Sequence, residues 1–178
     1  MPGRQQYRET DRRGVERDCS GTVPVGAVPD SNIFLKGVIV MKIAVVYWSG
    51  TGNTEAMANA AAEGAKNAGA EVVLLNNLSA ADLASYDAVA FGCPAMGAEE
   101  LEDSEFEPMF AALEGSLNGK KIALFGSYGW GDGEWMRTWE DRCKDDGAVF
   151  ACDPVICNEA PDDVAVAACK ALGEALTK

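Results

Sequence analysis

The chain has 178 residues, which is one domain's worth of sequence, and 48% of them are hydrophobic. Its 28 Asp and Glu residues outnumber 15 Lys and Arg residues, and the resulting net charge of −13 disfavours binding to nucleic acid or to an anionic membrane. There is no histidine, which excludes Ser-His and Cys-His catalysis and removes the commonest metal ligand. The six cysteines show no zinc-ligand spacing, so we expect no metal site and reduced thiols in a cytoplasmic protein.

Residues 1–32 show little periodic apolar patterning, and we predict a disordered extension over residues 1–40. Residues 36–41 are Lys-Gly-Val-Ile-Val-Met, which can be encoded with a ribosome-binding-like GGAG a few bases before an ATG. This suggests the hypothesis that Met41 is the true initiator and that residues 1–40 are translated upstream sequence. A targeting or tethering arm is the alternative.

From Met41 onward, short apolar runs alternate with longer segments of helical period. The predicted strands cover residues 42–48, 71–76, 87–93 and 121–127, and a weaker pair of stretches lies between Ala148 and Cys157. Runs that are nearly continuous in apolar residues are typical of strands covered on both faces. The segments between them are long enough for helical crossovers, so we expect a parallel sheet.

Four helices are predicted between and after these strands. Their expected starts are Asn53 or Thr54, either of which can cap the first helix, then Ser104, Asp132 and Pro161. Gly69 is expected to end the first helix. The apolar side chains expected to be buried are Met57, Ala61, Ala65, Ala68, Phe106, Phe110, Leu113, Trp135, Met136 and Trp139. This order of elements predicts a doubly wound α/β fold, in which a ligand binds outside the carboxyl ends of the strands.

The loop after the first strand has the sequence WSGTGNTEAM, residues 48–57. Its glycines allow a tight turn, and its hydroxyl and amide side chains lie beside the free N–H groups of a helix N-terminus, a combination that favours phosphate binding. The loop has no Walker lysine, and Glu55 replaces the third Gly of a dinucleotide fingerprint, so nucleoside triphosphates and NAD are disfavoured. A Gly/Ser/Thr turn with a capped helix is the alternative interpretation.

Two later loops are also unusual. After the third strand, Met96 and Gly97 place a polarizable thioether on a flexible hinge, and six acids follow within nine residues at positions 99–107. A solvated acidic loop is the alternative there. After the fourth strand, Trp130 lies between two glycines and has little local chain to pack against, so we expect its indole to project toward a planar partner.

The motifs WSGTGNTE, AMG followed by acids and SEFEP, and ALFGSYGWGDG together resemble the short-chain flavodoxins of anaerobic bacteria, over residues 41–178. The resemblance implies a flavodoxin-like three-layer α/β/α sandwich around a five-stranded parallel sheet of order 2-1-3-4-5. It implies a low-potential, one-electron carrier that binds FMN non-covalently and has no substrate turnover of its own. Implied partners are redox proteins with basic docking patches, such as ferredoxin-type oxidoreductases, and we expect a monomer.

Within that resemblance, each loop receives a role. The first loop holds the FMN phosphate, Met96 and Trp130 sandwich the isoalloxazine ring, and Glu99 accepts a hydrogen bond from the flavin N3 position. The Gly97 peptide turns on one-electron reduction, so that its carbonyl accepts the proton at flavin N5. The implied FMN-binding residues are Ser49, Gly50, Thr51, Gly52, Asn53, Thr54, Pro94, Ala95, Met96, Gly97, Ala98, Glu99, Ser127, Tyr128, Gly129, Trp130, Gly131 and Asp132.

Two positions depart from the family's common pattern. Pro94 stands where a Ser or Thr often adds a phosphate contact, and Ala98 stands where an acid often follows the Gly. Two other function classes remain open: an FMN-dependent quinone or nitroreductase of related fold, and a non-redox phosphate-binding or receiver-like module. The first lacks a visible site for a hydride donor, and the second lacks acids directly after the first strand, where Ser49 and Gly50 stand.

Overall fold

The computed structural model describes residues 40–178. The predicted extension over residues 1–40 and the hypothesis of a start at Met41 therefore concern residues that, Val40 and Met41 apart, lie outside the described range.

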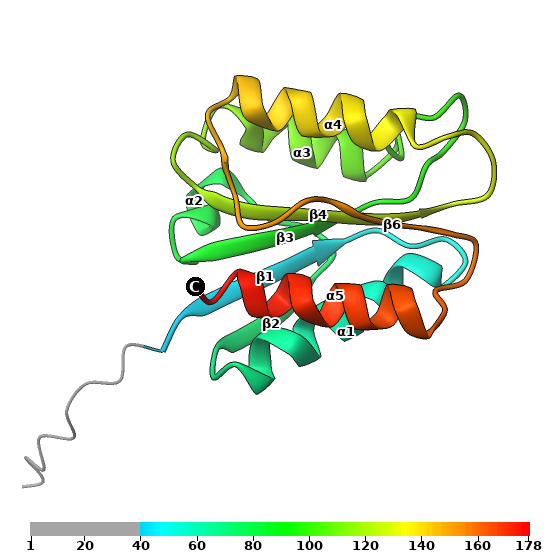
Figure 1. The fold of residues 1–178 in the computed structure, drawn as a ribbon. Coiled ribbons are helices and arrows are strands. Elements are labelled where there is room, and N and C mark those ends of the chain that lie inside the picture. The colour runs from blue at the N-terminus through cyan, green and yellow to red at the C-terminus, as the bar shows by residue number, and fades with distance from the viewer. Residues whose placement is uncertain (1–39) are drawn as a thin grey trace, which may run out of the picture. The chain divides into compact units, whose positions relative to one another are not determined.

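Six strands form one parallel sheet in the order β2-β1-β3-β4-β5, with β6 also paired to β4 (Figure 1). The strands are β1 (Lys42–Tyr47), β2 (Glu71–Leu75), β3 (Ala88–Gly92), β4 (Lys121–Tyr128), β5 (Val149–Phe150) and β6 (Val155–Asn158). The predicted strand order is confirmed, but the fifth strand is divided in two. β5 pairs with the start of β4 and β6 with its end, and Pro154, which has no backbone N–H, lies in the interruption.

The helices form a layer on each face of the sheet, which confirms the predicted three-layer sandwich (Figure 1). They are α1 (Asn53–Asn67), α2 (Ala80–Leu83), α3 (Phe106–Glu114), α4 (Glu134–Asp145) and α5 (Asp163–Ala175). α1 and α5 cover one face, and α3 and α4 cover the other. The single turn of α2, in which Ser79 Oγ accepts a hydrogen bond from Asp82 N–H, was not predicted. The last helix begins at Asp163 rather than Pro161, because Asp162 is its N-cap.

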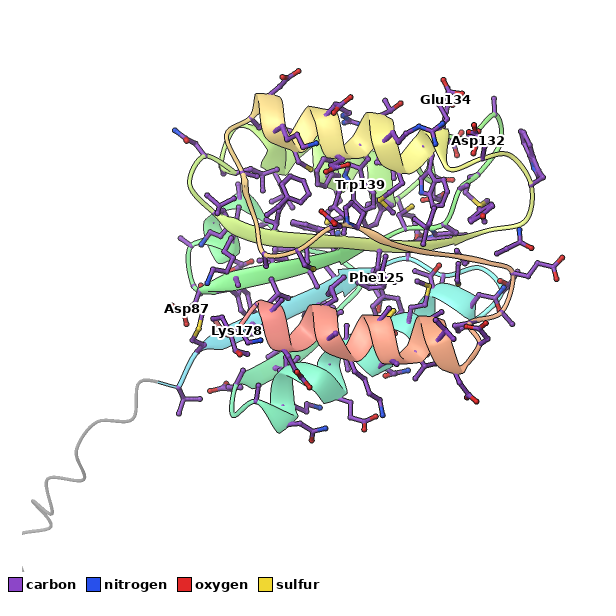
Figure 2. The ribbon with its side chains drawn as sticks, viewed as in Figure 1. Asp87, Phe125, Asp132, Glu134, Trp139 and Lys178 are labelled. Atoms are coloured by element: carbon purple, nitrogen blue, oxygen red, sulfur yellow. The ribbon has the colours of Figure 1, made fainter. Side chains whose placement is uncertain are left out.

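The sheet separates two apolar cores, because successive side chains of a strand point to opposite faces. In β1, Ala44 and Val46 pack with α3 and α4, while Ile43 and Val45 pack with α1 and α5. Figure 2 shows Trp139 of α4 on the first side of the sheet and Phe125 of β4 on the second. Of the apolar side chains predicted to be buried, all are buried except Ala68, which is exposed.

The α1–α5 pair packs unusually closely through small residues. A Cβ atom added at Gly64 would overlap the carbonyl oxygen of Lys170, and one added at Gly173 would overlap the carbonyl oxygen of Ala61. These two glycines therefore allow the helix backbones to touch, and the pair covers the sheet face beneath the loop that follows β1.

Candidate functional site

The carboxyl ends of β1, β3 and β4 bring the three predicted loops together at one end of the sheet. Backbone hydrogen bonds between neighbouring strands continue into these loops. Trp48 N–H donates to Gly92 O at 3.0 Å, and Ala95 N–H donates to Ser127 O at 2.9 Å. A cavity of about 320 Å³ lies between the loops. It is lined by Trp48, Gly50, Thr51, Asn53, Pro94, Ala95, Met96, Ser127, Tyr128, Gly129 and Glu159.

Most of this lining coincides with the residues that the sequence singled out. The other implied residues lie in the same three loops but do not line the cavity: Ser49, Gly52, Thr54, Gly97, Ala98, Glu99, Trp130, Gly131 and Asp132. Sequence reasoning missed Glu159, which follows β6, has φ 56° and donates its N–H to Tyr128 O at 2.7 Å. The weak pattern of the fifth strand gave no register that would have placed the loop after it here.

Ser49 organises the first loop. Its Oγ accepts hydrogen bonds from the N–H groups of Gly52, at 3.1 Å, and Glu55, at 3.2 Å. The prediction that Asn53 or Thr54 caps α1 is therefore wrong, since a left-handed turn at Gly52, with φ 90°, precedes Asn53 and brings the Ser49 side chain to the first helical turn instead. Within residues 40–178, the N–H groups of Thr51, Asn53 and Thr54 have no acceptor, so they are available to an anion.

Beneath this loop, Thr54 of α1 and Ser127 of β4 form a buried hydroxyl pair. Their Oγ atoms lie 3.2 Å apart, and the two residues are 1% and 4% exposed. Each hydroxyl can both donate and accept, so each keeps unused hydrogen-bonding capacity. Ser127 also lines the cavity and offers that capacity to a ligand there.

Residues 96–100 form a tight turn that we call the Met96 hairpin. Met96 N–H donates to Glu100 O at 2.8 Å, and Glu100 N–H donates to Met96 O at 2.9 Å. The turn places both Gly97, with φ 50°, and Glu99, with φ 58°, in the left-handed region, which a glutamate adopts only under external constraint. The Met96 side chain lines the cavity and is partly exposed.

Residues 129–133 form the Trp130 loop. Trp130 is 63% exposed, which confirms the prediction that its indole projects from the protein. Gly131 and Gly133 both have φ 89°, a conformation that favours glycine. The Met96 hairpin and the Trp130 loop thus present a thioether and an indole from neighbouring strands β3 and β4.

Glu99 connects these two loops. Its Oε1 accepts hydrogen bonds from the N–H groups of Gly133, at 2.9 Å, and Glu134, at 3.1 Å, at the start of α4. The resemblance implies that this carboxylate also accepts from the flavin N3 position. Oε2 has no partner within the described part of the chain, so one oxygen stays available for that role.

The acidic run after the hairpin is not simply solvated. Glu102 is 4% exposed and accepts hydrogen bonds from Ser104 Oγ and from the N–H groups of Ser104, Glu105 and Phe106, at 2.6 to 2.9 Å. Burial alone would raise its pKa, but these hydrogen bonds outweigh burial and lower the pKa to about 2. Glu102 therefore stabilises the start of α3 as a charged group.

Two more acids of the run have structural partners. Glu105 accepts a hydrogen bond from Trp48 Nε1 at 3.2 Å, and both oxygens of Glu107 accept from Arg142 of α4, at 2.8 and 2.9 Å. Arg142 also donates to Glu114 at 2.8 Å, and its hydrogen bond to Glu107 raises its pKa. The alternative of a solvated acidic loop consequently applies to Glu100 and Asp103, which are exposed, but not to the whole run.

Glu99, Asp132 and Glu134 place carboxylate oxygens within 4.8 Å of one another (Figure 2 labels the latter two). One oxygen of Glu99 is engaged by backbone N–H groups, and Asp132 pairs with Arg137 at 2.7 Å. The three groups are therefore better explained as parts of the α4 N-terminus than as ligands of an ion.

Five of the six cysteines lie in the described range, and all five are free thiols. Burial raises the pKa of Cys93, Cys143 and Cys169 to about 12, which leaves them without nucleophilic character at neutral pH. Among the described residues, no helix has both the length and the apolar content needed to span a bilayer.

Comparisons with known proteins agree with this geometry. The family model described as Flavodoxin matches residues 45–172. The flavodoxin of Megasphaera elsdenii is 53% identical over 138 residues, covering 76% of this chain and 98% of that protein, and the flavodoxin of Clostridium beijerinckii is 47% identical over 121 residues, covering 67% and 88%. The solution structure of two-electron reduced Megasphaera elsdenii flavodoxin superposes with a TM-score of 0.68, covering 75% of this chain and 97% of that one. The chain therefore belongs to the flavodoxin family, in its short-chain, clostridial-like form.

Proposed function

We propose that this flavodoxin holds FMN in the cavity between its three loops and passes electrons one at a time, at low potential, between protein partners. As a flavodoxin, the protein binds FMN and carries electrons, and FMN supplies the redox chemistry when bound. The observation that carries the proposal is the shape of the cavity. Uncharged donors at the start of α1 and the Met96 side chain both line it, and Trp130 projects, 63% exposed, from the loop after β4 that supplies more of its lining.

The first loop suits the phosphate of FMN. It offers unpartnered backbone N–H groups, the hydroxyl of Thr51 and the amide of Asn53, and the positive end of the α1 dipole. No Lys or Arg lines the cavity, so a bound phosphate would keep its negative charge. That charge would oppose further reduction of the nearby ring, which supports the low potential.

The other end of the cavity suits a flat ring. Ala95, Met96 and Tyr128 give it apolar walls, and Trp130, on the loop after β4, supplies an indole that is 63% exposed. Pro94 lines the cavity where relatives often have a hydroxyl, so one phosphate contact is replaced by an apolar one.

The partners we propose are redox proteins with basic docking patches. Three exposed acids lie on the loops that follow β3 and β4, namely Glu100, Asp103 and Asp132, and the chain carries a net charge of −13. Such a field steers a basic partner toward the exposed edge of the ring. A cytoplasmic location suits the free thiols, and we propose that the protein acts as a monomer.

The test of cofactor binding is titration of the FMN-free full chain with FMN, followed by quenching of flavin fluorescence. Trp130→Ala and Met96→Ala should each weaken FMN binding by about ten-fold, because each removes one wall of the ring site. Val164→Ala is the control, since Val164 is also an exposed apolar residue, at 75%, and lies on α5. Failure of the wild-type chain to bind FMN would refute the proposal.

The carrier role is separated from the enzyme alternative by a second measurement. Reductive titration of the FMN-loaded protein should give two one-electron steps, whereas added NADH or NADPH should be oxidised no faster than by free FMN. Rapid oxidation of either nucleotide by the protein alone would favour the quinone or nitroreductase alternative instead.

A further inference from the structure

The Glu99 carboxylate occupies a space that the chain leaves open for it. A Cβ atom added at Gly131 would overlap the Glu99 carboxyl group, so a glycine at that position leaves room for the carboxylate where it lies. Glu99 reaches this space from a left-handed backbone conformation, with φ 58°, that costs free energy in a residue with a Cβ atom. The contacts of the carboxylate must therefore offset the cost of this backbone conformation.

Charged groups of both signs lie near this carboxylate, since Arg137 pairs with Asp132 at 2.7 Å. Asp132 and Glu134 bring carboxylate oxygens within 4.8 Å of those of Glu99, at the start of α4 (Figure 2). The hydrogen bonds from Gly133 and Glu134 N–H, together with the positive end of the α4 dipole, hold the carboxylate in place against these charges. A carboxylate held by two backbone donors of another loop, from a residue with positive φ, is a connecting element and not an idle surface acid.

We propose that Glu99 is a positioning residue that ties the Met96 hairpin to the first turn of α4, so that the two walls of the ring site keep a fixed separation before FMN arrives. Oε1 accepts both hydrogen bonds of this tie, and Oε2 has no partner within the described part of the chain. The hairpin bonds between Met96 and Glu100 then connect the tie to the thioether, and the Trp130 loop, which ends at Gly133, connects it to the indole.

This inference rests on the proposed function only where FMN is concerned, so its main test uses the FMN-free full chain. Amide hydrogen exchange is measured by NMR at Gly133 and Glu134, and at Met96 and Glu100. Glu99→Asn shortens the side chain by one methylene while keeping a residue that tolerates positive φ. We expect exchange at all four amides to rise by about ten-fold in this variant, since bonds to a charged acceptor are lost.

Glu99→Gln provides the conservative comparison, because its amide oxygen can still accept from both N–H groups of α4. Exchange at the four amides should stay within about two-fold of wild type in this variant, and in the neighbouring control Glu100→Gln. FMN binding should nevertheless weaken in Glu99→Gln, since the amide NH₂ would then face the N3 proton. This contrast separates the tie from the role of the free oxygen.

Unchanged exchange at either pair of amides in Glu99→Asn would overturn the proposal, as would equal acceleration in Glu99→Gln. If instead the wild-type chain fails to bind FMN, the proposed function fails while the exchange data still decide whether the tie exists. A global loss of structure in Glu99→Asn would show as faster exchange in the buried strands β3 and β4, so those amides are monitored as an internal reference.

Discussion

Ser49 and Asn53 are near neighbours in the first loop, but they use their polar atoms differently. Ser49 accepts two backbone hydrogen bonds within the loop, whereas Asn53 lines the cavity and its side chain has no partner within residues 40–178. Ser49→Ala should therefore destabilise the FMN-free protein by about 1 kcal/mol, as loss of a capping oxygen does, and should also weaken FMN binding.

Asn53→Ala is the matched variant for that prediction. It should change the free energy of unfolding by less than about 0.5 kcal/mol while still weakening FMN binding. Urea denaturation and FMN titration of both variants give the two readouts. Equal destabilisation by both substitutions would contradict the assignment of the cap to Ser49.

Glu102 should make the protein sensitive to acid. Its pKa is about 2 when folded and 4.5 in the ordinary exposed state, so its charged form stabilises the fold above about pH 4.5 and this contribution is lost as the pH falls toward 2. Glu102→Gln should lower the free energy of unfolding at pH 7 by about 1–3 kcal/mol, since an amide oxygen accepts less strongly than a carboxylate.

Urea denaturation of both proteins between pH 5 and pH 2 checks this prediction. The pH dependence of unfolding should be shallower in Glu102→Gln across that window. Glu100→Gln, which changes an exposed acid of the same run, is the control and should keep the wild-type profile. An identical pH profile for Glu102→Gln would show that the carboxylate is not charged and bound as described.

At the residue scale, the sequence predicted which side chains belong to the site better than it predicted the hydrogen bonds that they make. Met96 and Trp130 were found because a thioether beside a glycine and an indole between glycines have no ordinary local use. The structural roles of Glu102 and Arg142 were missed, since an acidic run shows only its total charge and a lone Arg in a helix gives no sign of its distant partners. The cap of α1 was assigned to Asn53 or Thr54 instead of Ser49, because the capping contact of Ser49 depends on the left-handed turn at Gly52.

Among the elements, the α1–α5 pair is the most sensitive to added volume. Gly64→Ala and Gly173→Ala should each destabilise the protein by about 1–3 kcal/mol, because each methyl group would meet a backbone carbonyl that cannot move aside without separating the helices. The loss occurs even though Ala is the better helix former. Thermal or urea unfolding of the FMN-free chain measures it.

Gly115→Ala is the control for the helix pair. Gly115 ends α3 with ordinary helical dihedrals, φ −61°, and a Cβ atom there would have no neighbour within 4 Å. This substitution should stabilise the protein by about 0.4–1 kcal/mol, because it reduces the freedom of the unfolded chain. Destabilisation by Gly115→Ala of the size expected at Gly173 would remove the case for close backbone contact.

The elements themselves were predictable wherever burial is two-sided. β1 to β4 lie within a residue or two of their expected ranges, since strands covered on both faces must be apolar throughout. The division between β5 and β6 was not predictable in detail, because strands of two and four residues carry too few apolar positions. The single turn of α2 was not predicted either, because a helix of four residues is too short to show an apolar period.

On the scale of the whole molecule, the exposed acids near the cavity should lower the second reduction potential of bound FMN. Glu99 and Glu102 are unsuitable for testing this, because both hold helix termini. Combined Glu100→Gln, Asp103→Asn and Asp132→Asn substitutions should raise that potential by an amount on the order of tens of millivolts at low salt, and by less at high salt.

A second triple variant controls for net charge alone. Glu71→Gln, Asp145→Asn and Asp146→Asn remove the same charge near the amino ends of the strands, at the opposite end of the sheet from the cavity. Potentiometric titration should show a smaller change for this variant. Equal shifts in the two variants would contradict this prediction, because a Coulombic effect on the potential must decrease with distance from the ring.

The break between β5 and β6 also affects how copies of the protein meet one another. An uninterrupted outer strand would offer a continuous row of backbone donors and acceptors, on which a neighbouring molecule could build. Here the row stops after Phe150 and resumes at Val155, with a proline in between, so added strands would find no continuous template. We therefore expect Val149 and Ile156, which are exposed on this border, not to serve as a template for fibrous assembly.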